Sequence, residues 1–285
     1  MRKKINIGII GLGYVGLPLL LLINKKFNVF GFDKDKSKVS SLKKKISYIS
    51  DVKNDELKRL NSDIFNHSSE YHKLSLCDYV IICLPTPLKK NIPDMSYIED
   101  CFSEIYKYLK KNQTIILESS VYTGATRDIF EKKINKKFKL GKNFFLCYSP
   151  ERIDPGQEKL IKKTEYVNIT KLISGHSKKC LAKIRILYKS VFKKIYECSS
   201  IEVAETAKLL ENIYRSVNIG LVNEMKIITH KLNLNIHQVI DAAGSKPFGF
   251  RKFSPGPGVG GHCIPIDPVF MSWLAKKNGN ESKFI

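Results

Sequence analysis

A glycine motif near the N-terminus constrains the fold more than any other feature of this sequence. Residues 8–16 read GIIGLGYVG, and Gly11, Gly13 and Gly16 follow an apolar run that begins at Ile5. Glycines at this spacing allow a tight turn, close approach of the backbone to a ligand and close packing of a helix on a strand. The segment therefore predicts a buried strand, a tight turn and the first turn of a helix.

Short apolar runs alternate with helical stretches through the first two thirds of the chain. The runs lie at residues 5–10, 29–32, 79–84, 114–117 and 144–147, and two further strands are expected at 166–173 and 194–197. Runs this continuously apolar are typical of parallel strands that are buried on both faces. Helices are expected between them at residues 15–26, 36–44, 96–110, 124–136 and 177–189. The pattern predicts an α/β fold in which an N-terminal Rossmann-like, doubly wound parallel sheet occupies residues 1–198.

A carboxylate stands where a dinucleotide site needs one. Asp33 ends the second predicted strand, 17 residues after Gly16, close to the ~20 expected for a ribose-binding acid. It would bind the ribose hydroxyls and repel a 2′-phosphate, which favours NAD over NADP, although nearby lysines weaken that preference. The helix that starts at Gly16 would face the pyrophosphate with its N-terminus. The cofactor residues predicted from this motif are Gly11, Gly13, Tyr14, Val15, Gly16 and Asp33.

The pattern changes at Ser199. Ser199 and Glu202 have the spacing of a capping box, and apolar residues then recur every three or four positions as far as Leu232. This predicts one helix of about 30 residues, followed by shorter helices at 236–243 and 268–277. We therefore expect an all-α central domain at residues 199–285. Its long apolar stripe suggests a homodimer interface, although a neighbouring domain could cover the same stripe.

The formal charge of +22 raises the question of nucleic acid binding. The lysines are scattered through every segment, and no RRM, zinc-finger or helix-turn-helix signature accompanies them. A lysine-rich solvated surface is the favoured interpretation, with no nucleic acid partner. The charge can still attract an anionic substrate.

Cysteine spacing and hydropathy limit the other classes. The seven cysteines are widely spaced and include no C-x-x-C, so we expect neither a disulfide framework nor a metal site. That usage fits a reducing, cytoplasmic compartment. Glycines and Pro18 interrupt the apolar N-terminal run, which argues against a signal peptide, and no other run approaches the ~20 residues of a membrane span.

Cys263 lies in a loop that reads GPGVGGHCIPIDP. Glycines and prolines in this density build a rigid, tight cradle, and a thiol there is a candidate nucleophile, although a buried inert cysteine is the commoner case. Asp267 follows four residues later. Lys208 and Asn212 share one face of the long helix, although a solvated lysine is the usual explanation for such a position. Glu151 follows a predicted strand at its carboxyl end, where open α/β sheets bind ligands.

Together these segments resemble one family, the nucleotide-sugar 6-dehydrogenases, which are NAD-dependent UDP-glucose, GDP-mannose and UDP-N-acetylhexosamine dehydrogenases. The spelling GGHCIP and the segment SPERIDPG are more similar to the UDP-N-acetylhexosamine branch. The segments that carry the resemblance are GLGYVGLP at 11–18, CLPTP at 83–87, LESSVYTGAT at 117–126, SPERIDPG at 149–156, AETAKLLENIYRSVNIGLVNE at 204–224, GSKPFGF at 244–250 and PGPGVGGHCIPIDP at 255–268.

The resemblance implies a four-electron oxidation of the sugar C6 alcohol to a uronic acid, which supplies precursors of cell-surface polysaccharide. Cys263 would add to the intermediate aldehyde as a thiohemiacetal, and a second oxidation would leave a thioester for hydrolysis. Lys208 would stabilise the oxyanion at C6, while Asn212 and Asp267 would hold water or assist proton transfer. Glu151 would orient or activate the hydrolytic water.

The resemblance also implies further binding residues. Lys38 matches a family position near the adenosine, and Thr86 and Ser120 match positions at the nicotinamide side. The UDP-sugar would contact Arg152, Lys208, Phe253, Gly256 and Gly260. Three departures stand out, namely Thr123 where the family commonly has proline, Ser120 where it has threonine, and Pro155 where the UDP-glucose branch has a second glutamate. The last weakens the assignment of Glu151 as a base.

Length is the largest departure, because family members continue with a C-terminal Rossmann-like domain that grips the nucleotide, and this sequence ends at Ile285. We expect that domain to be absent and the chain to be truncated. Two alternatives are a catalytically silent NAD-binding remnant and one half of a split enzyme. A third class, the β-hydroxyacid and 6-phosphogluconate dehydrogenases, shares the lysine and asparagine on a long helix but oxidises once and needs no thiol.

Overall fold

The computed structural model describes residues 5–66, 70–152, 167–261 and 264–285. It divides into two compact units. Unit 1 comprises Met1–Pro87 and Asp94–Thr206, and unit 2 comprises Leu88–Pro93 and Ala207–Ile285. Each unit is described by itself below, and the predicted domains of residues 1–198 and 199–285 stay predictions.

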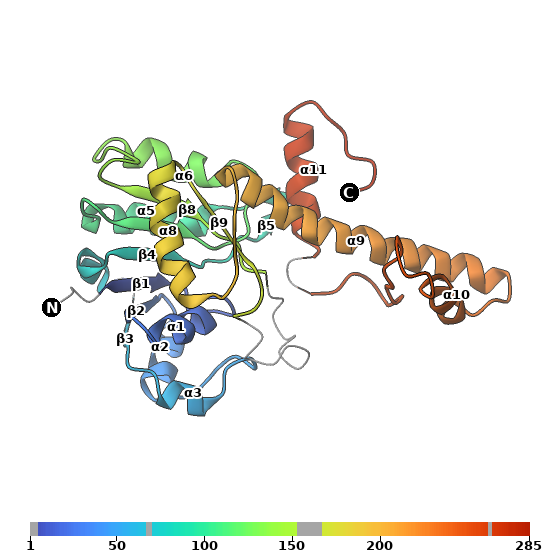
Figure 1. Cartoon of the computed structure of the whole chain (residues 1–285), viewed down its shortest axis with the longest axis horizontal. Coiled ribbons are helices and arrows are strands. Elements are labelled where there is room, and N and C mark those ends of the chain that lie inside the picture. Colours follow the sequence, from blue (N-terminus) through green and yellow to red (C-terminus); the bar gives the residue numbers. More distant parts are fainter. Residues whose placement is uncertain (1–4, 67–69, 153–166, 262–263) are drawn as a thin grey trace. The chain divides into compact units, whose positions relative to one another are not determined.

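Unit 1 contains an eight-stranded sheet in the order β10-β9-β8-β7-β4-β1-β2-β3 (Figure 1). The six strands from β8 to β3 run parallel, and β9 pairs with β8 in the antiparallel direction, so β9 and β10 are reversed relative to the rest. The predicted α/β sheet is confirmed. Its strands are β1 (Asn6–Ile10), β2 (Asn28–Asp33), β3 (Asp63–Asn66), β4 (Tyr79–Ile82), β7 (Thr114–Leu117), β8 (Phe145–Tyr148), β9 (Lys171–Gly175) and β10 (Ile195–Glu197).

Helices cover both faces of this sheet. The helical segments of unit 1 are α1 (Gly16–Asn24), α2 (Lys36–Lys43), α3 (Asn54–Lys58), η1 (Tyr71–Leu76), α5 (Ser96–Ile105), η2 (Tyr106–Tyr108), α6 (Ala125–Ile134) and α8 (Lys178–Val191). Apolar side chains of α1, α2 and α8 form one buried cluster with alternate residues of the strands, such as Ile7 and Ile9. On the opposite face Phe32 packs on Tyr71, whose hydroxyl contacts Cys101 of α5. The sheet is therefore doubly wound, as predicted.

Two differences from the sequence-based prediction concern the strands β3 and β9. β3 was not predicted, because only Ile64 and Phe65 of this short edge strand are apolar, and two residues make no recognisable period. The strand expected at 166–173 begins at Lys171, since Val167–Asn168 form a turn. As an edge strand, β3 pairs on one side only, so its sequence carries a weaker signal than that of a central strand.

Unit 2 is mainly helical. The long helix α9 (Ile201–Lys231) begins in unit 1, continues into unit 2 and confirms the predicted element. Ser200, one residue later than expected, caps it by accepting a hydrogen bond from the Val203 N–H at 3.2 Å. The other elements are α10 (Ile236–Ala243), α11 (Asp267–Lys277) and a hairpin of β5 (Leu88–Lys89) and β6 (Ile92–Pro93).

Candidate active site

The glycine turn of unit 1 contains two glycines that the fold requires and a third that lies beside open space. A Cβ on Gly11 would lie 2.4 Å from the Cys83 carbonyl oxygen, and a Cβ on Gly16 would lie 1.8 Å from the Gly11 carbonyl oxygen. Both glycines are needed for the fold itself, and Gly11 also has a φ of +88°. Gly13 is different, because a Cβ there would meet nothing within 4 Å. Its bare backbone therefore suits a close ligand.

The start of α1 fits the pyrophosphate of a dinucleotide. No side chain caps this helix, and its N-cap residue is Val15. The Leu17 N–H donates to the Gly13 carbonyl oxygen at 3.0 Å, and Pro18 has no N–H. An anion here would therefore be bound by N–H groups that precede Leu17, and the helix dipole also favours it. Together with the open space at Gly13, this arrangement fits NAD. Tyr14, which the motif also includes, exposes 46% of its surface beside this turn.

Asp33 braces the same turn from the end of β2. Its two carboxylate oxygens accept hydrogen bonds from the N–H groups of Leu12 at 2.8 Å and Asp35 at 2.9 Å. The Lys38 ammonium lies 3.9 Å from the carboxylate, so these two predicted cofactor residues lie close together. This places a carboxylate at the edge where a ribose would bind.

Tyr48 is a residue of this turn that the sequence analysis missed. Its hydroxyl donates to the Leu12 carbonyl oxygen at 2.5 Å. Burial, followed by the charges of Asp33 and Asp35, raises the pKa of Tyr48, which keeps the hydroxyl protonated as a donor. Leu12 is thus held at its N–H by Asp33 and at its carbonyl by Tyr48. No sequence period marks Tyr48, because it lies in a connection without regular structure.

The two residues expected at the nicotinamide side are brought together. The Thr86 hydroxyl donates to the Ser120 carbonyl oxygen at 2.6 Å. Ser119 joins the same two connections, because its hydroxyl bonds both the N–H and the carbonyl of Leu84, at 2.9 Å and 2.6 Å. The segments that follow β4 and β7 are therefore tied to each other beside the glycine turn.

Thr123 and Glu205 form a second unpredicted arrangement. Thr123, which stands where the resemblance expects proline, places its hydroxyl 2.8 Å from that of Thr206. The buried Glu205 carboxylate accepts from the Gly124 N–H at 2.6 Å, the Thr126 N–H at 3.0 Å and the Thr126 hydroxyl at 2.6 Å. Glu205 thereby caps the N-terminus of α6 from the first turns of α9.

Glu151 lies at the carboxyl end of β8, as expected from its place in the sequence. Its Oε1 accepts from the Arg152 N–H at 2.7 Å, and Lys171 Nζ lies 3.3 Å from its Oε2. Arg152 also donates to the Thr170 carbonyl oxygen at 2.7 Å. The sequence analysis missed Lys171 and its other partner Glu118, although a lysine within a predicted buried strand was an available signal.

Unit 2 brings together two of its three predicted polar residues. The Asn212 side-chain amide donates to Asp267 Oδ2 at 2.6 Å, and both residues are buried. Asn212 Oδ1 is also buried and has no hydrogen-bond partner among the described residues. Lys208, one helical turn earlier, is buried as well. Cys263, expected to be the nucleophile, lies outside the described residues.

Two models of one protein family match this chain over most of its length. The model described as the NAD binding domain of the UDP-glucose/GDP-mannose dehydrogenase family matches residues 5–192, and that of the central domain of the same family matches residues 202–285. The chain belongs to the UDP-glucose/GDP-mannose dehydrogenase family. It therefore carries the NAD binding domain of that family, which agrees with the fit of the glycine turn.

Named relatives within the UDP-glucose/GDP-mannose dehydrogenase family are similar over almost the whole chain. Protein CapL of Staphylococcus aureus is 37% identical over 98% of this chain and 65% of the relative. The UDP-N-acetyl-D-glucosamine 6-dehydrogenase of Pseudomonas aeruginosa is 35% identical over 99% of this chain and 66% of the relative. The chain thus spans just under two thirds of these relatives. A solved UDP-D-ManNAc dehydrogenase from Pyrococcus horikoshii has a TM-score of 0.88 at 28% identity, over 95% of this chain and 65% of that one.

The residues predicted to wrap the sugar in this family member lie in the segment after α10. The Phe253 ring is partly buried and packs against the small core of unit 2, which contains Val222, Ile236 and Ile240. The Gly256 N–H donates to Asn223 Oδ1 of α9 at 2.8 Å. Gly260 has a φ of +61°, a conformation that favours glycine. Their binding role stays a prediction.

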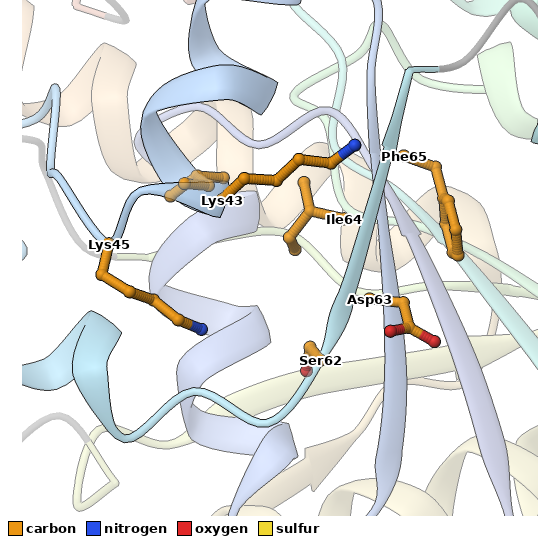
Figure 2. Close-up of a pocket in the computed structure, with 7 residues that line it drawn as sticks. Lys43, Lys45, Ser62, Asp63, Ile64 and Phe65 are labelled. Atoms are coloured by element: carbon orange, nitrogen blue, oxygen red, sulfur yellow. The ribbon is translucent and has the colours of Figure 1, made fainter.

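A hollow of about 350 Å³ at the sheet edge is separate from these residues. In Figure 2 the side chains of Lys43, the last residue of α2, and Lys45, two residues beyond it, lie on the same side of the edge strand β3 as Ile64, while the Asp63 carboxylate lies on the other side. None of its lining residues was predicted to bind cofactor or substrate, and none follows the carboxyl end of a strand, where α/β sheets bind ligands.

Two further observations concern membrane-spanning helices and metal sites. None of the helices in the described part of the chain is both long enough and apolar enough to cross a membrane. Within those same residues, no group of three or more histidine, cysteine, aspartate or glutamate side chains could hold a metal ion.

Proposed function

We propose that the chain is an NAD-dependent nucleotide-sugar 6-dehydrogenase that oxidises the C6 alcohol of a UDP-N-acetylhexosamine to the uronic acid. One observation carries the proposal, which is the buried Asn212–Asp267 pair with an amide oxygen left without a partner among the described residues. A buried polar atom of this kind is costly unless a water or substrate group pairs with it. The printed names of the relatives support the substrate class.

The glycine turn would hold NAD, which supplies one hydride acceptor for each of the two oxidations, so each four-electron turnover uses two NAD molecules. Cys263 would hold the aldehyde as a thiohemiacetal and then as a thioester. Lys208 would stabilise negative charge at the C6 oxygen, and Asn212 and Asp267 would hold water or assist proton transfer. Glu151 would take part in the hydrolysis of the thioester. Arg152, Phe253, Gly256 and Gly260 would contact the UDP-sugar.

We also propose a homodimer formed through α9. Five apolar residues along this helix expose 45–62% of their surface, namely Val203, Leu210, Tyr214, Leu221 and Ile228, and Leu232 just after the helix exposes 62%. A continuous apolar stripe of this length favours association with another protein surface. The six cysteines in the described part of the chain are free thiols. Free thiols are compatible with a reducing compartment, where we propose that the enzyme makes a precursor of cell-surface polysaccharide.

The decisive experiment supplies the purified chain with NAD and each of the UDP-N-acetylhexosamines. We expect NADH and a uronic acid in a ratio of two to one, with Cys263→Ala forming no uronic acid. Since the chain spans just under two thirds of its relatives, the assay is repeated with the remaining segment of a relative added as a separate polypeptide. NAD binding without NADH in either assay would favour a catalytically silent protein.

A further inference from the structure

A buried lysine lies between two carboxylates, Glu118 and Glu151, where the strands β7 and β8 end. Lys171 Nζ lies 2.6 Å from Glu118 Oε2 and 3.3 Å from Glu151 Oε2. The side chains of Lys171 and Glu118 expose 4% and 0% of their surface, and that of Glu151 exposes 11%. A charged group this deeply buried is costly unless it is paired, so the cluster is a specific arrangement and not a surface ion pair.

The reversed strand β9 explains how the three residues meet. Glu118 directly follows β7, and Glu151 comes shortly after β8, so both lie at the carboxyl ends of parallel strands. Lys171 is the first residue of β9, which runs antiparallel to β8. The start of β9 therefore meets the ends of β7 and β8, which delivers the ammonium to the two carboxylates.

Burial and the neighbouring aromatic residues Tyr188 and Phe192 also influence the charges of Glu118 and Lys171. The Tyr188 hydroxyl of α8 donates a hydrogen bond to Glu118 Oε1. Burial raises the pKa of Glu118, and Glu151 adds to that rise while Lys171 opposes it. Burial by itself disfavours the charged form of Lys171, but the two carboxylates outweigh it and raise the pKa of the ammonium. The rings of Phe192 and Tyr188, 5.5 Å and 6.0 Å from Lys171 Nζ, favour the cation further.

We propose that Lys171, anchored by Glu118 and Tyr188, is a positioning residue that holds the Glu151 carboxylate in place for hydrolysis of the Cys263 thioester. This inference rests on the proposed function. Lys171 anchors Glu151 Oε2, and the Arg152 N–H anchors Oε1, so the orientation of the carboxylate is restrained at both oxygens. A second lone pair on each oxygen can accept a hydrogen bond from water.

In the step that this arrangement serves, a water oxygen bonds to the thioester carbonyl carbon as one water proton passes to Glu151. The carbon–sulfur bond then breaks, and its electron pair leaves with the Cys263 sulfur. No oxidant is required at this stage. Misplacement of the carboxylate should therefore slow hydrolysis without slowing the oxidations that precede it.

The test compares Lys171→Met with a matched control, Lys189→Met, which removes an exposed lysine from α8. NADH is followed through the first turnover, and the quenched protein is weighed by intact mass spectrometry. We expect Lys171→Met to release two NADH per chain in a burst and to accumulate the sugar thioester, with hydrolysis slowed on the order of 10- to 100-fold. Lys189→Met should behave as the wild type.

A second variant protects the test against misfolding. Lys171→Met alone leaves Glu118 buried without its ammonium, whereas Lys171→Met/Glu118→Gln removes both charges and should retain the fold. The double variant should still accumulate the thioester.

The outcomes separate the two proposals. A wild-type chain that forms no NADH, even with the remaining segment of a relative added, contradicts the proposed function. The wild-type chain can turn over while a folded Lys171→Met or double variant hydrolyses the thioester at the wild-type rate. That result overturns the role of Lys171 and leaves the proposed function intact. Slower NADH formation in the burst itself, without thioester accumulation, would likewise refute positioning of Glu151.

Discussion

Asn212 and Asp267, 55 residues apart in the chain, meet through a hydrogen bond of 2.6 Å between buried side chains. Asn212 lies on α9, and Asp267 is the first residue of α11, where a carboxylate also favours the helix N-terminus. The contact therefore fixes the start of α11 against α9 within unit 2. Because Asp267 comes four residues after Cys263 in the sequence, the contact also fixes the end of the segment GPGVGGHCIPIDP.

Replacing Asp267 by asparagine should separate the catalytic from the structural role of this contact. Asparagine keeps an oxygen that can accept from the Asn212 amide but removes the charge. We expect kcat to decrease about 100-fold, as for loss of a general acid or base, while the free energy of unfolding changes by less than about 1 kcal/mol. Steady-state kinetics and denaturant unfolding measure the two quantities. A large loss of stability with an unchanged kcat per folded chain would contradict the catalytic role.

Alanine substitutions in the glycine turn should distinguish folding from cofactor binding. Gly13→Ala places a Cβ in open space, so we expect an unchanged Tm but an affinity for NAD at least ~10-fold weaker, since the added methyl group obstructs the pyrophosphate. Gly16→Ala is the matched control, because its Cβ would collide with the Gly11 carbonyl and should lower Tm. Calorimetric titration with NAD and thermal unfolding give both values. NAD binding to Gly13→Ala at wild-type affinity would place the dinucleotide elsewhere.

The cap formed by Glu205 should make stability depend on pH. Burial outweighs the hydrogen bonds from Gly124 and Thr126 and raises the pKa of Glu205 from 4.5 to about 7. Between these values the folded protein holds a proton that the unfolded chain releases, so stability should fall as pH rises from 4.5 to about 7. The loss should reach at most roughly 3 kcal/mol.

Denaturant unfolding at pH 5 and pH 8 tests this expectation, with Glu205→Gln as the reference that cannot titrate. The wild type should lose more stability between the two values than the variant does. Equal losses in the two proteins would show that Glu205 remains ionised throughout this range.

A charge on the apolar stripe of α9 should prevent dimerisation. Leu221 exposes 55% of its surface, and glutamate at this position would be buried without a partner in a dimer interface. We expect Leu221→Glu to sediment as a monomer under conditions in which the wild type is a dimer. Ile186→Glu is the control, because Ile186 is comparably exposed at 62% but lies on α8 of unit 1. A monomeric wild type would contradict the proposed interface.

Local sequence patterns were sufficient for most elements and for the glycine turn. Buried parallel strands such as β1 and β4 are continuously apolar, and α9 repeats its apolar residues at helical spacing, so both are visible within a short window of sequence. The spacing from Gly16 to Asp33 likewise marks the turn and its carboxylate. These signals are local because each depends on one element and its immediate connection.

The sequence by itself determined the doubly wound α/β sheet, the long helix and the dinucleotide motif. Only the tertiary structure decided that β9 is reversed, because strand direction depends on pairing between distant segments. That reversal places Lys171 between Glu118 and Glu151, and long-range packing likewise sets Tyr48 against Leu12 and Glu205 at the start of α6. A buried polar group takes its partner from whatever element lies beside it in space, and no periodicity along the chain records that neighbour.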